Sequence, residues 1–274
     1  MPTYSDDWQA RNGRYVTRPG FEQYAEKYAD YFVMTRENGV IELRMHTDGG
    51  PANFTMGVHN AWGQAWLEVG NDPENEVLIL TGTGEHWLNP GEPEKMAEVM
   101  REPRPEHFAY ETYYDAAKLV ENLVFGLDIP TIAAVNGPSP GHTEFALMCD
   151  ITLASERATF VDSHLPFGTA PGDGLNIAFQ ELLGTKRAAY YLYTGAEIDA
   201  RTALELGMVN EVLPQAELLP RAWQLARTIR ARPRAARRLT HAVATRPWRR
   251  RLVQDFGYGL AHEMFGISAD KIFG

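Results

Sequence analysis

Cysteine is almost absent from the sequence, and long hydrophobic runs are missing altogether. Cys149 is the one cysteine among 274 residues, which excludes an internal disulfide and a zinc site built from cysteines. A lone cysteine fits a reducing compartment, so we expect a cytoplasmic protein. There is no run of about 18 apolar residues, and the first residues are polar and partly acidic. We therefore expect neither a membrane span nor a secretory signal.

Acidic residues are missing from one long segment. The chain carries 36 Asp and Glu against 26 Lys and Arg, a net charge of −10, yet residues 221–251 contain 11 arginines and no acid. The acidic remainder argues against nucleic acid as a partner. We interpret the arginine run as a solvated helical surface or as a surface that pairs with an acidic neighbouring subunit. Binding of an anionic ligand is the alternative.

Cofactor motifs are missing as well. The sequence has no zinc-binding spacing, no glycine-rich nucleotide loop with its lysine, and no Gly-x-Ser-x-Gly elbow. We therefore expect no metal ion and no organic cofactor. With 44% hydrophobic and 23% charged residues, the composition itself is ordinary for a globular protein.

The order of apolar patterns predicts an α/β fold. The Asn38-Gly39 pair separates the apolar runs Tyr31–Thr35 and Val40–His46, which is a strong hairpin signal. Short continuous apolar runs predict two buried strands, Val77–Thr81 and Thr131–Val135. Apolar residues at helical spacing predict two helices, 57–70 and 107–127. Strands and helices alternate in this way along the chain, which is typical of repeated ββα units.

We expect three parts in the chain. Residues 1–30 form an N-terminal arm and residues 31–220 form the α/β core. Residues 221–274 form a C-terminal helical region that serves oligomerisation and closes the site. The proline- and arginine-rich stretch 231–250 is expected to separate the core from the C-terminal helices.

Three ordered segments resemble the crotonase (enoyl-CoA hydratase/isomerase) superfamily. They read IPTIAAVNGPSPGHTEFALMCDITLASERATF, then FGTAPGDG, then YYLYTGAEIDARTALELGMVNEVLP. The resemblance implies a spiral of ββα turns with C-terminal helices, assembled as homo-trimers or homo-hexamers. It also implies that two backbone N–H groups stabilise an enolate oxygen. Gly141 matches one donor and the loop near Asn89 the other, although the usual small residues there are replaced and Pro90 has no N–H.

The acid–base positions depart from the hydratase pattern. Glu144 matches the first carboxylate of the hydratases, but the second falls at His164, so hydration by a glutamate pair is not expected. Position 142 is usually glycine and is His142 here, and the usual small residue of the Pro-Gly turn is Asp173. These changes resemble the β-diketone hydrolases of the 6-oxocamphor hydrolase type.

That subgroup cleaves a carbon–carbon bond by a retro-Claisen reaction. The resemblance implies that a dyad of His164 and Asp173 activates water, that His142 lies near the substrate carbonyl, and that Glu263 lines the site. It places an aromatic residue of the early loop at Phe54, with Gly141, Glu144 and Asn89 also near the substrate. Each of these acids has a structural alternative. Asp173 could close a turn, Glu144 could form a cap or an ion pair, and Glu263 could be a surface acid of a helix. His164 and Asp173 are nine positions apart in a loop rich in Pro and Gly, so sequence spacing alone does not pair them.

We therefore expect a hydrolase that cleaves a β-diketone, expected to be cyclic, as a small-molecule substrate. One alternative is an acyl-CoA hydratase, isomerase or thioesterase of the same fold, with the arginine run holding the coenzyme A phosphates. Against it, the early segment Thr47–Thr55 contains no Lys or Arg. The other alternative is a non-catalytic member of the fold, which the placement of His164 and Asp173 argues against.

Overall fold

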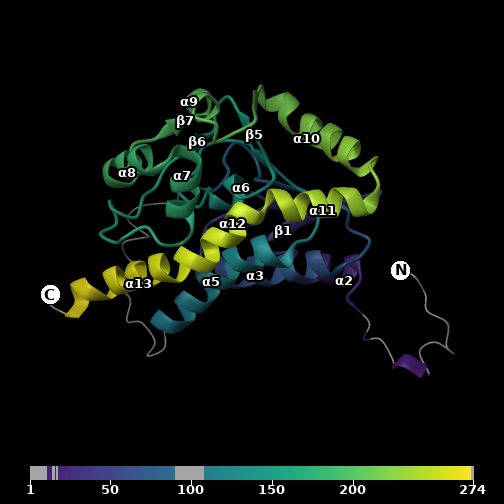
Figure 1. Cartoon of the computed structure of the whole chain (residues 1–274), viewed down its shortest axis with the longest axis horizontal. Coiled ribbons are helices and arrows are strands. Elements are labelled where there is room, and N and C mark those ends of the chain that lie inside the picture. Colours follow the sequence, from purple (N-terminus) through teal and green to yellow (C-terminus); the bar gives the residue numbers. More distant parts are fainter. Residues whose placement is uncertain (1–10, 14–15, 17, 90–107, 273–274) are drawn as a thin grey trace.

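The structure is a computed structural model, which describes residues 11–13, 16, 18–89 and 108–272 (Figure 1). Its centre is a six-stranded sheet in the order β1-β2-β3-β4-β5-β8. The bounds of these strands are Phe32–Glu37, Val40–Met45, Val77–Thr81, Thr131–Val135, Ile151–Ser155 and Glu211–Leu213. The β1–β2 pair is antiparallel, and every later neighbour in this sheet is parallel. A second sheet pairs β6 (Thr159–Phe160) with β7 (Ile198–Asp199). The predicted α/β class is confirmed.

The predicted hairpin is present with the predicted turn. Asn38 and Gly39 both have positive φ, 51° and 81°, which are values that a two-residue hairpin turn needs. An added Cβ at Gly39 would lie 2.8 Å from Cγ of Glu76. Glycine is therefore required at this corner by backbone conformation and by space.

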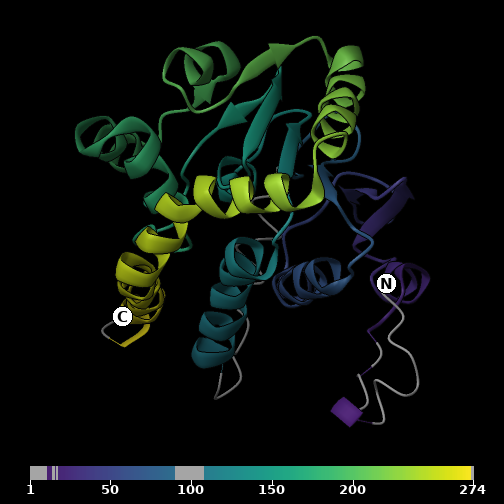
Figure 2. The ribbon, with the colours of Figure 1, turned by 45° about the vertical axis from the view of Figure 1, so that its right-hand side comes forward.

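Helices cover both faces of the main sheet. On one face, α10 (Gln215–Arg230) packs Leu218, Ala222 and Ala226 against apolar residues of β3, β4 and β5. On the other face lie α3 (Met56–Asn71) and α5 (Phe108–Gly126), which pack against each other (Figure 2). The predicted helices 57–70 and 107–127 are confirmed, with residue 107 outside the described part of the chain. None of the helices described is both long and apolar enough to span a membrane.

The remaining helices are short or lie toward the chain ends. The N-terminal arm contains α2 (Phe21–Lys27), whose Tyr24 hydroxyl donates a buried hydrogen bond to Asp72, and the first ten residues of the arm lie outside the described residues. One short helix, α6 (Glu144–Leu147), lies between β4 and β5. Three helices lie between β6 and β8, namely α7 (Leu175–Leu183), α8 (Thr185–Thr194) and α9 (Ala200–Glu205).

The stretch 231–250 does not separate the core from the C-terminal helices, because it is helical itself. It forms α11 (Arg234–Ala244) and most of α12 (Arg246–Arg251), which lead through the π-helix η1 (Leu252–Phe256) into α13 (Gly257–Ile272). Buried His241 of α11 contacts the Asp150 carboxylate at 2.7 Å and the Leu127 carbonyl at 3.1 Å. The expected separation is therefore wrong, since α11 is tied directly to the core.

Several arginines of the run pair with acids of the same chain. Arg234 and Arg237 both bind Glu76, and Arg238 lies 2.7 Å from Asp128. The expectation of a purely solvated or intersubunit surface is to this extent wrong. The run joins α11 to the acidic body of its own chain.

Candidate active site

Two histidines and four carboxylates meet where loops leave the strands. His142 follows β4 and lies just before α6, while Asp162, His164 and Asp173 belong to the loop between β6 and α7. Glu263 reaches the same place from α13, near the end of the chain. The loop after β4 leaves the main sheet and the loop after β6 leaves the second sheet, and the contact between His142 and Asp173 joins the two loops.

His142 sits on a strained backbone. Its φ is +52°, a left-handed conformation that favours glycine and costs other residues about 1–3 kcal/mol. The Trp87 indole N–H donates to its carbonyl oxygen at 3.3 Å, and its Nδ1 lies 3.1 Å from Glu144 Oε1 and 3.1 Å from Asp173 Oδ2. One ring nitrogen of His142 thus faces two carboxylates, and these contacts hold the ring in place despite the unfavourable backbone conformation.

The two buried carboxylates control the protonation of His142. Burial lowers the pKa of His142, but the negative charges of Glu144 and Asp173 outweigh burial and raise the pKa to about 10. Burial, together with the charge of Asp173, raises the pKa of Glu144 to about 7. His142 is therefore an imidazolium near neutral pH, while Glu144 changes its charge there.

His164 is held from both sides. Its Nδ1 lies 3.1 Å from Asp162 Oδ2, and its Nε2 lies 3.4 Å from Asp173 Oδ2 and 3.7 Å from Glu263 Oε1. The structure thus brings together the three residues predicted around His164, namely Asp173, His142 and Glu263, and adds a fourth in Asp162. Asp173 lies between the two histidines and contacts both.

The charges around His164 strongly favour its protonated form. Burial lowers the pKa of His164, but Asp173, Asp162 and Glu263 outweigh burial and raise the pKa to about 12. Burial would raise the pKa of Asp173, but the two histidines hold it well below its usual range. Burial raises the pKa of Glu263. Glu263 is therefore the neighbour best suited to take a proton from His164.

Aromatic rings form the wall beside His142. The Phe54 ring stacks on the His142 ring with centroids 3.6 Å apart, and the His59 ring lies 4.3 Å from Phe54. Nδ1 of His59 donates to the Thr55 carbonyl at 2.9 Å. Burial, with the charge of His142, lowers the pKa of His59 to about 4, so His59 is neutral at pH 7. Phe54 thus separates a neutral from a charged histidine.

The two backbone N–H groups expected to bind an enolate oxygen differ in the contacts that they already make. The Gly141 N–H makes a long contact of 3.5 Å to Ser139 Oγ, and α6 begins three residues later, at Glu144. The Asn89 N–H is already donated to the Ala52 carbonyl at 2.9 Å. The N–H of Asn89 itself is thus already used, and residues 90–107 of the same loop lie outside the described residues, so a donor from this loop stays a prediction. The side-chain amide of Asn89 donates to Asn53 at 2.8 Å, which supports the loop that carries Phe54.

Two residues of this cluster were missed from the sequence. Asp162 stands two residues before His164 and accepts the main-chain N–H of His164, a turn that Asp commonly makes. His59 lies in the first turn of α3, five residues after Phe54. A polar side chain so near a predicted site residue is a usable signal in both cases.

The donor set of the cluster could also hold a metal ion. Among the described residues, His142, Glu144 and Asp173 offer ligand atoms that all lie within 4.8 Å of one another. Imidazole and carboxylate are suitable ligands for several divalent ions. Nδ1 of His142 lies 3.1 Å from an oxygen of each of these carboxylates, so a proton on this nitrogen competes with a metal ion for the same place.

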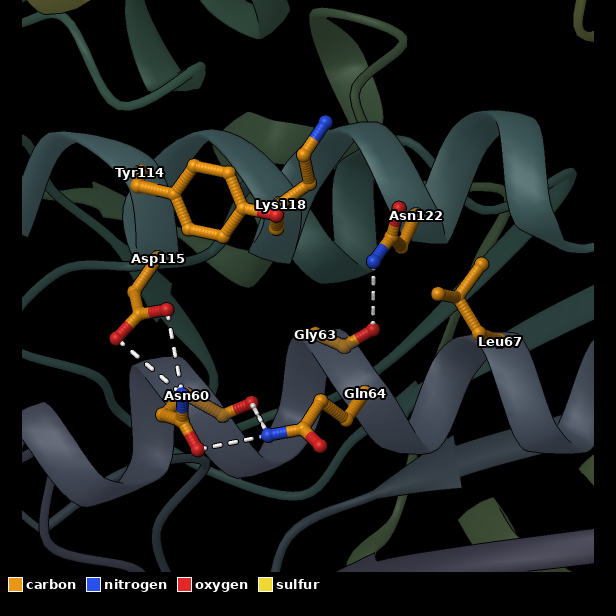
Figure 3. Close-up of a pocket in the computed structure, with 8 residues that line it drawn as sticks. All are labelled: Asn60, Gly63, Gln64, Leu67, Tyr114, Asp115, Lys118 and Asn122. Atoms are coloured by element: carbon orange, nitrogen blue, oxygen red, sulfur yellow. Dashed lines mark hydrogen bonds between the residues drawn. The ribbon is translucent and has the colours of Figure 1, made fainter. Parts of the chain in front are cut away.

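A separate groove lies between α3 and α5 and is lined by residues of these two helices (Figure 3). Its volume is about 410 Å³, and the Asn60 side-chain amide donates to Asp115 across it at 3.3 Å. None of the histidines or carboxylates of the cluster lines it. The acid–base chemistry therefore belongs to the buried cluster and not to this groove.

The parallel sheet wrapped by helices and the buried histidine–carboxylate pairs are features of an α/β enzyme that works by acid–base groups. The chain belongs to the enoyl-CoA hydratase/isomerase family, whose model matches residues 35–265. The predicted crotonase superfamily is thereby confirmed.

Individual relatives differ in their named activities. A β-diketone hydrolase from the cyanobacterium Anabaena sp. PCC 7120, bound to (S)-3-oxocyclohexyl acetic acid, is 35% identical with a TM-score of 0.84, covering 93% of this chain and all of that one. Carnitinyl-CoA dehydratase of Salmonella enteritidis is 33% identical over 72% of this chain and 73% of its own. Crotonyl-CoA hydratase of Syntrophomonas wolfei is 32% identical over 64% of this chain and 66% of its own.

Proposed function

We propose that the protein is a hydrolase that cleaves a carbon–carbon bond of a β-diketone by a retro-Claisen reaction. The observation that carries the proposal is the position of Asp173 between His142 and His164, at 3.1 Å and 3.4 Å. This arrangement offers one histidine to a carbonyl oxygen and another to a water molecule. The similarity to a β-diketone hydrolase over 93% of the chain supports the same conclusion.

The reaction begins at the carbonyl and at water. His142, protonated near neutral pH, donates to a substrate carbonyl oxygen through the ring nitrogen that does not face Glu144 and Asp173. His164 takes a proton from water, and the water oxygen forms a bond to the carbonyl carbon. The electron pair of the C=O bond moves to the oxygen, which His142 stabilises. General-base assistance of this kind contributes typically ~10²–10⁴ in rate.

Bond cleavage completes the cycle without a cofactor. The carbonyl C=O re-forms as the bond to the carbon between the two carbonyls breaks, and its electron pair becomes the enolate of the second ketone. His164 then returns its proton to that carbon. The products are a carboxylic acid and a ketone, joined in one molecule when the substrate is cyclic. Gly141 remains a candidate donor to the enolate oxygen.

His164 must first lose the proton that it carries in the free protein. Glu263 is the proposed acceptor, because its carboxyl group lies 3.7 Å from Nε2 and burial raises its pKa. Moving the proton from imidazolium to carboxylate leaves two neutral groups in a buried site. Burial of a substrate against the cluster favours that neutral pair, because charged groups lose more solvation than neutral ones.

The substrate class follows from chemistry and from the relative. Hydrolysis of a bicyclic 1,3-diketone opens one ring and yields a cyclic ketone with an acetic acid arm. (S)-3-oxocyclohexyl acetic acid, bound by the Anabaena relative, is a molecule of this kind. The stacked Phe54 and His142 rings supply an apolar wall with a polar tip, which suits a compact alicyclic diketone.

An acyl-CoA hydratase is the second candidate. The relatives named crotonyl-CoA hydratase and carnitinyl-CoA dehydratase are 32% and 33% identical to this chain. Glu144, with a pKa raised to about 7, could act as an acid or base on an enoyl thioester. The replacement of the second carboxylate by His164 disfavours this activity.

One screen separates the candidates. Cyclic and bicyclic 1,3-diketones and a panel of acyl-CoA thioesters are incubated with wild type and with His164→Ala. Loss of diketone absorbance, hydration of the enoyl group and release of free thiol are followed in parallel. We expect diketone cleavage by wild type, lowered ~10²–10⁴-fold in the variant. Turnover of thioesters alone, or near-normal diketone cleavage by a folded His164→Ala protein, would overturn the proposal.

A further inference from the structure

Asp162 is the most deeply buried carboxylate of the cluster and touches His164 twice. Its side chain has no exposed surface. Oδ1 accepts the main-chain N–H of His164 at 3.1 Å, and Oδ2 lies 3.1 Å from Nδ1 of the same residue. One carboxylate therefore fixes both the backbone and the ring of His164.

This double contact dictates which ring nitrogen of His164 keeps its hydrogen. A carboxylate only accepts, so Nδ1 must be the donor in the contact with Oδ2. In a neutral imidazole with hydrogen on Nδ1, Nε2 is the bare nitrogen. Nε2 is the nitrogen that faces Asp173 and Glu263, where a proton can be exchanged. The contact thus turns the basic nitrogen of His164 toward the other acid–base groups.

We propose that Asp162 is the positioning residue that sets the tautomer of His164, and that Asp173 acts on the opposite, reactive nitrogen. The inference rests on the proposed function, because it assigns roles within that reaction. Asp162 holds the ring and the Nδ1 hydrogen throughout the cycle. Asp173 contacts both His142 and His164 and so stabilises whichever of them carries a proton.

Asp162→Asn tests this assignment because an amide offers one acceptor where the carboxylate offers two. If the Asn oxygen keeps the main-chain N–H of His164, the amide N–H₂ faces Nδ1 and expels its hydrogen. Nε2 then keeps its hydrogen when the ring is neutral, so it can no longer accept a proton from water. We expect kcat to fall ~10³–10⁴-fold with KM changed less than about threefold, as expected when a carboxylate partner of a catalytic histidine becomes an amide.

Protonation of the two ring nitrogens of His164 is measured without any substrate. Protein labelled with ¹⁵N-histidine is examined by long-range ¹H–¹⁵N spectra, and the His164 signals are assigned by their loss in His164→Gln. We expect a protonated Nδ1 in wild type and in Asp173→Asn, and an unprotonated Nδ1 in Asp162→Asn. If wild type cleaves no diketone but the Nδ1 signals behave as expected, the proposed function fails and the tautomer assignment stands.

The matched control is Asp199→Asn. Asp199 also accepts a main-chain N–H through its side chain, from Thr202 at the start of α9, but it does not contact the cluster. We expect unchanged kcat and ring signals there. If Asp162→Asn does not fold, Asp162→Ser keeps a hydroxyl acceptor for the main chain and should show the same loss of kcat. An Nδ1 that stays protonated in a folded Asp162 variant, or a kcat within threefold of wild type, would overturn the assignment.

Discussion

At the scale of single residues, the pKa values of the buried histidines and carboxylates differ between the folded and unfolded states, so the stability of the protein depends on pH. The folded pKa of His142 is about 10 against an ordinary 6.5, so the folded state binds this proton more tightly than the unfolded chain does. The stabilisation is complete below pH 6.5 and is lost as the pH rises toward 10. Glu144 acts in the same direction, because its pKa rises from 4.5 to about 7, and the folded state loses stability as the pH rises through that range. Asp173 acts oppositely, and its contribution is lost as the pH falls below 3.8.

We therefore expect the free energy of unfolding to decline between pH 6.5 and pH 10, by at least about 1 kcal/mol, because the unfolded chain releases the His142 proton in this range while the folded state keeps it. Urea unfolding across this range measures the decline. His142→Gln should make the decline shallower without abolishing it, because His164 also keeps its proton over this range in the folded state. His262→Gln, a change at an exposed histidine of α13, should leave the slope as in wild type. A wild-type curve that rises toward alkaline pH would contradict the protonation of His142.

A second residue-scale prediction concerns metal ions. The ligand atoms of His142, Glu144 and Asp173 are close enough for a metal, but a metal would have to displace the proton of His142. Since the proposed reaction uses acid–base groups and water, dialysis against a strong chelator should leave diketone cleavage unchanged. Complete loss of activity that added metal restores would show that the cluster is a metal centre.

The sequence predicted single residues well only where a family pattern indicated them. His164, Asp173, His142 and Glu263 were expected near one another, and the structure brings them together. Asp162 was not foreseen, because its role depends on how the loop folds back onto His164. For the loop near Asn89, sequence does not show that the N–H of Asn89 is already bound to the Ala52 carbonyl, so a donor from this loop stays a prediction.

At the scale of elements, the site depends on how α13 packs against the loop 161–174. An added Cβ on Gly172 would lie 2.2 Å from the Gly259 carbonyl oxygen, so glycine is needed for this close approach. The Thr169 hydroxyl also donates to the Glu263 carbonyl at 2.8 Å. Asp173 follows Gly172, and Glu263 follows Gly259 by about one turn, so the contact sets both carboxylates around His164.

Gly172→Ala should therefore push α13 away from the loop. We expect a loss of stability of ~1–3 kcal/mol from overpacking, together with a kcat lowered at least tenfold as Glu263 moves away from His164. Thermal unfolding and diketone turnover measure the two effects. Gly50→Ala is the matched control, since an added Cβ there meets nothing closer than 3.6 Å. Full activity in Gly172→Ala would show that Glu263 does not need its present position.

Local patterns predicted the elements themselves far better than their packing. The Asn38-Gly39 turn and the strands β3 and β4 are determined by residues that are adjacent in the sequence. Their prediction was confirmed for this reason. The packing of α13 on a loop some ninety positions earlier leaves no periodic signal. The stretch 231–250 was expected to separate the core from the C-terminal helices, but Pro233 stands at the N-cap of α11, and this helix packs on the core.

At the scale of the whole molecule, the C-terminal helices present an apolar surface that one chain leaves uncovered. Large apolar side chains are exposed along α11, η1 and α13, namely Leu239, Val243, Val253, Tyr258 and Phe265. The arginines of α11 are engaged with Glu76 and Asp128 of their own chain, so charge pairing between subunits is a weaker argument than this apolar surface. Exposed apolar patches commonly mark an interface between proteins.

We expect a homo-trimer or a multiple of it, because family membership and the apolar C-terminal surface both favour assembly through these helices. Light scattering at micromolar concentration and moderate salt should give the mass of three or six chains. Val253 is 78% exposed in the single chain, and Val253→Glu should shift the mass toward the monomer, because a buried unpaired charge is costly at an interface. Val33→Glu, which changes an exposed valine of β1, should leave the assembly intact. A monomeric mass for wild type under these conditions would exclude the oligomer and leave the apolar surface of α11, η1 and α13 to another partner.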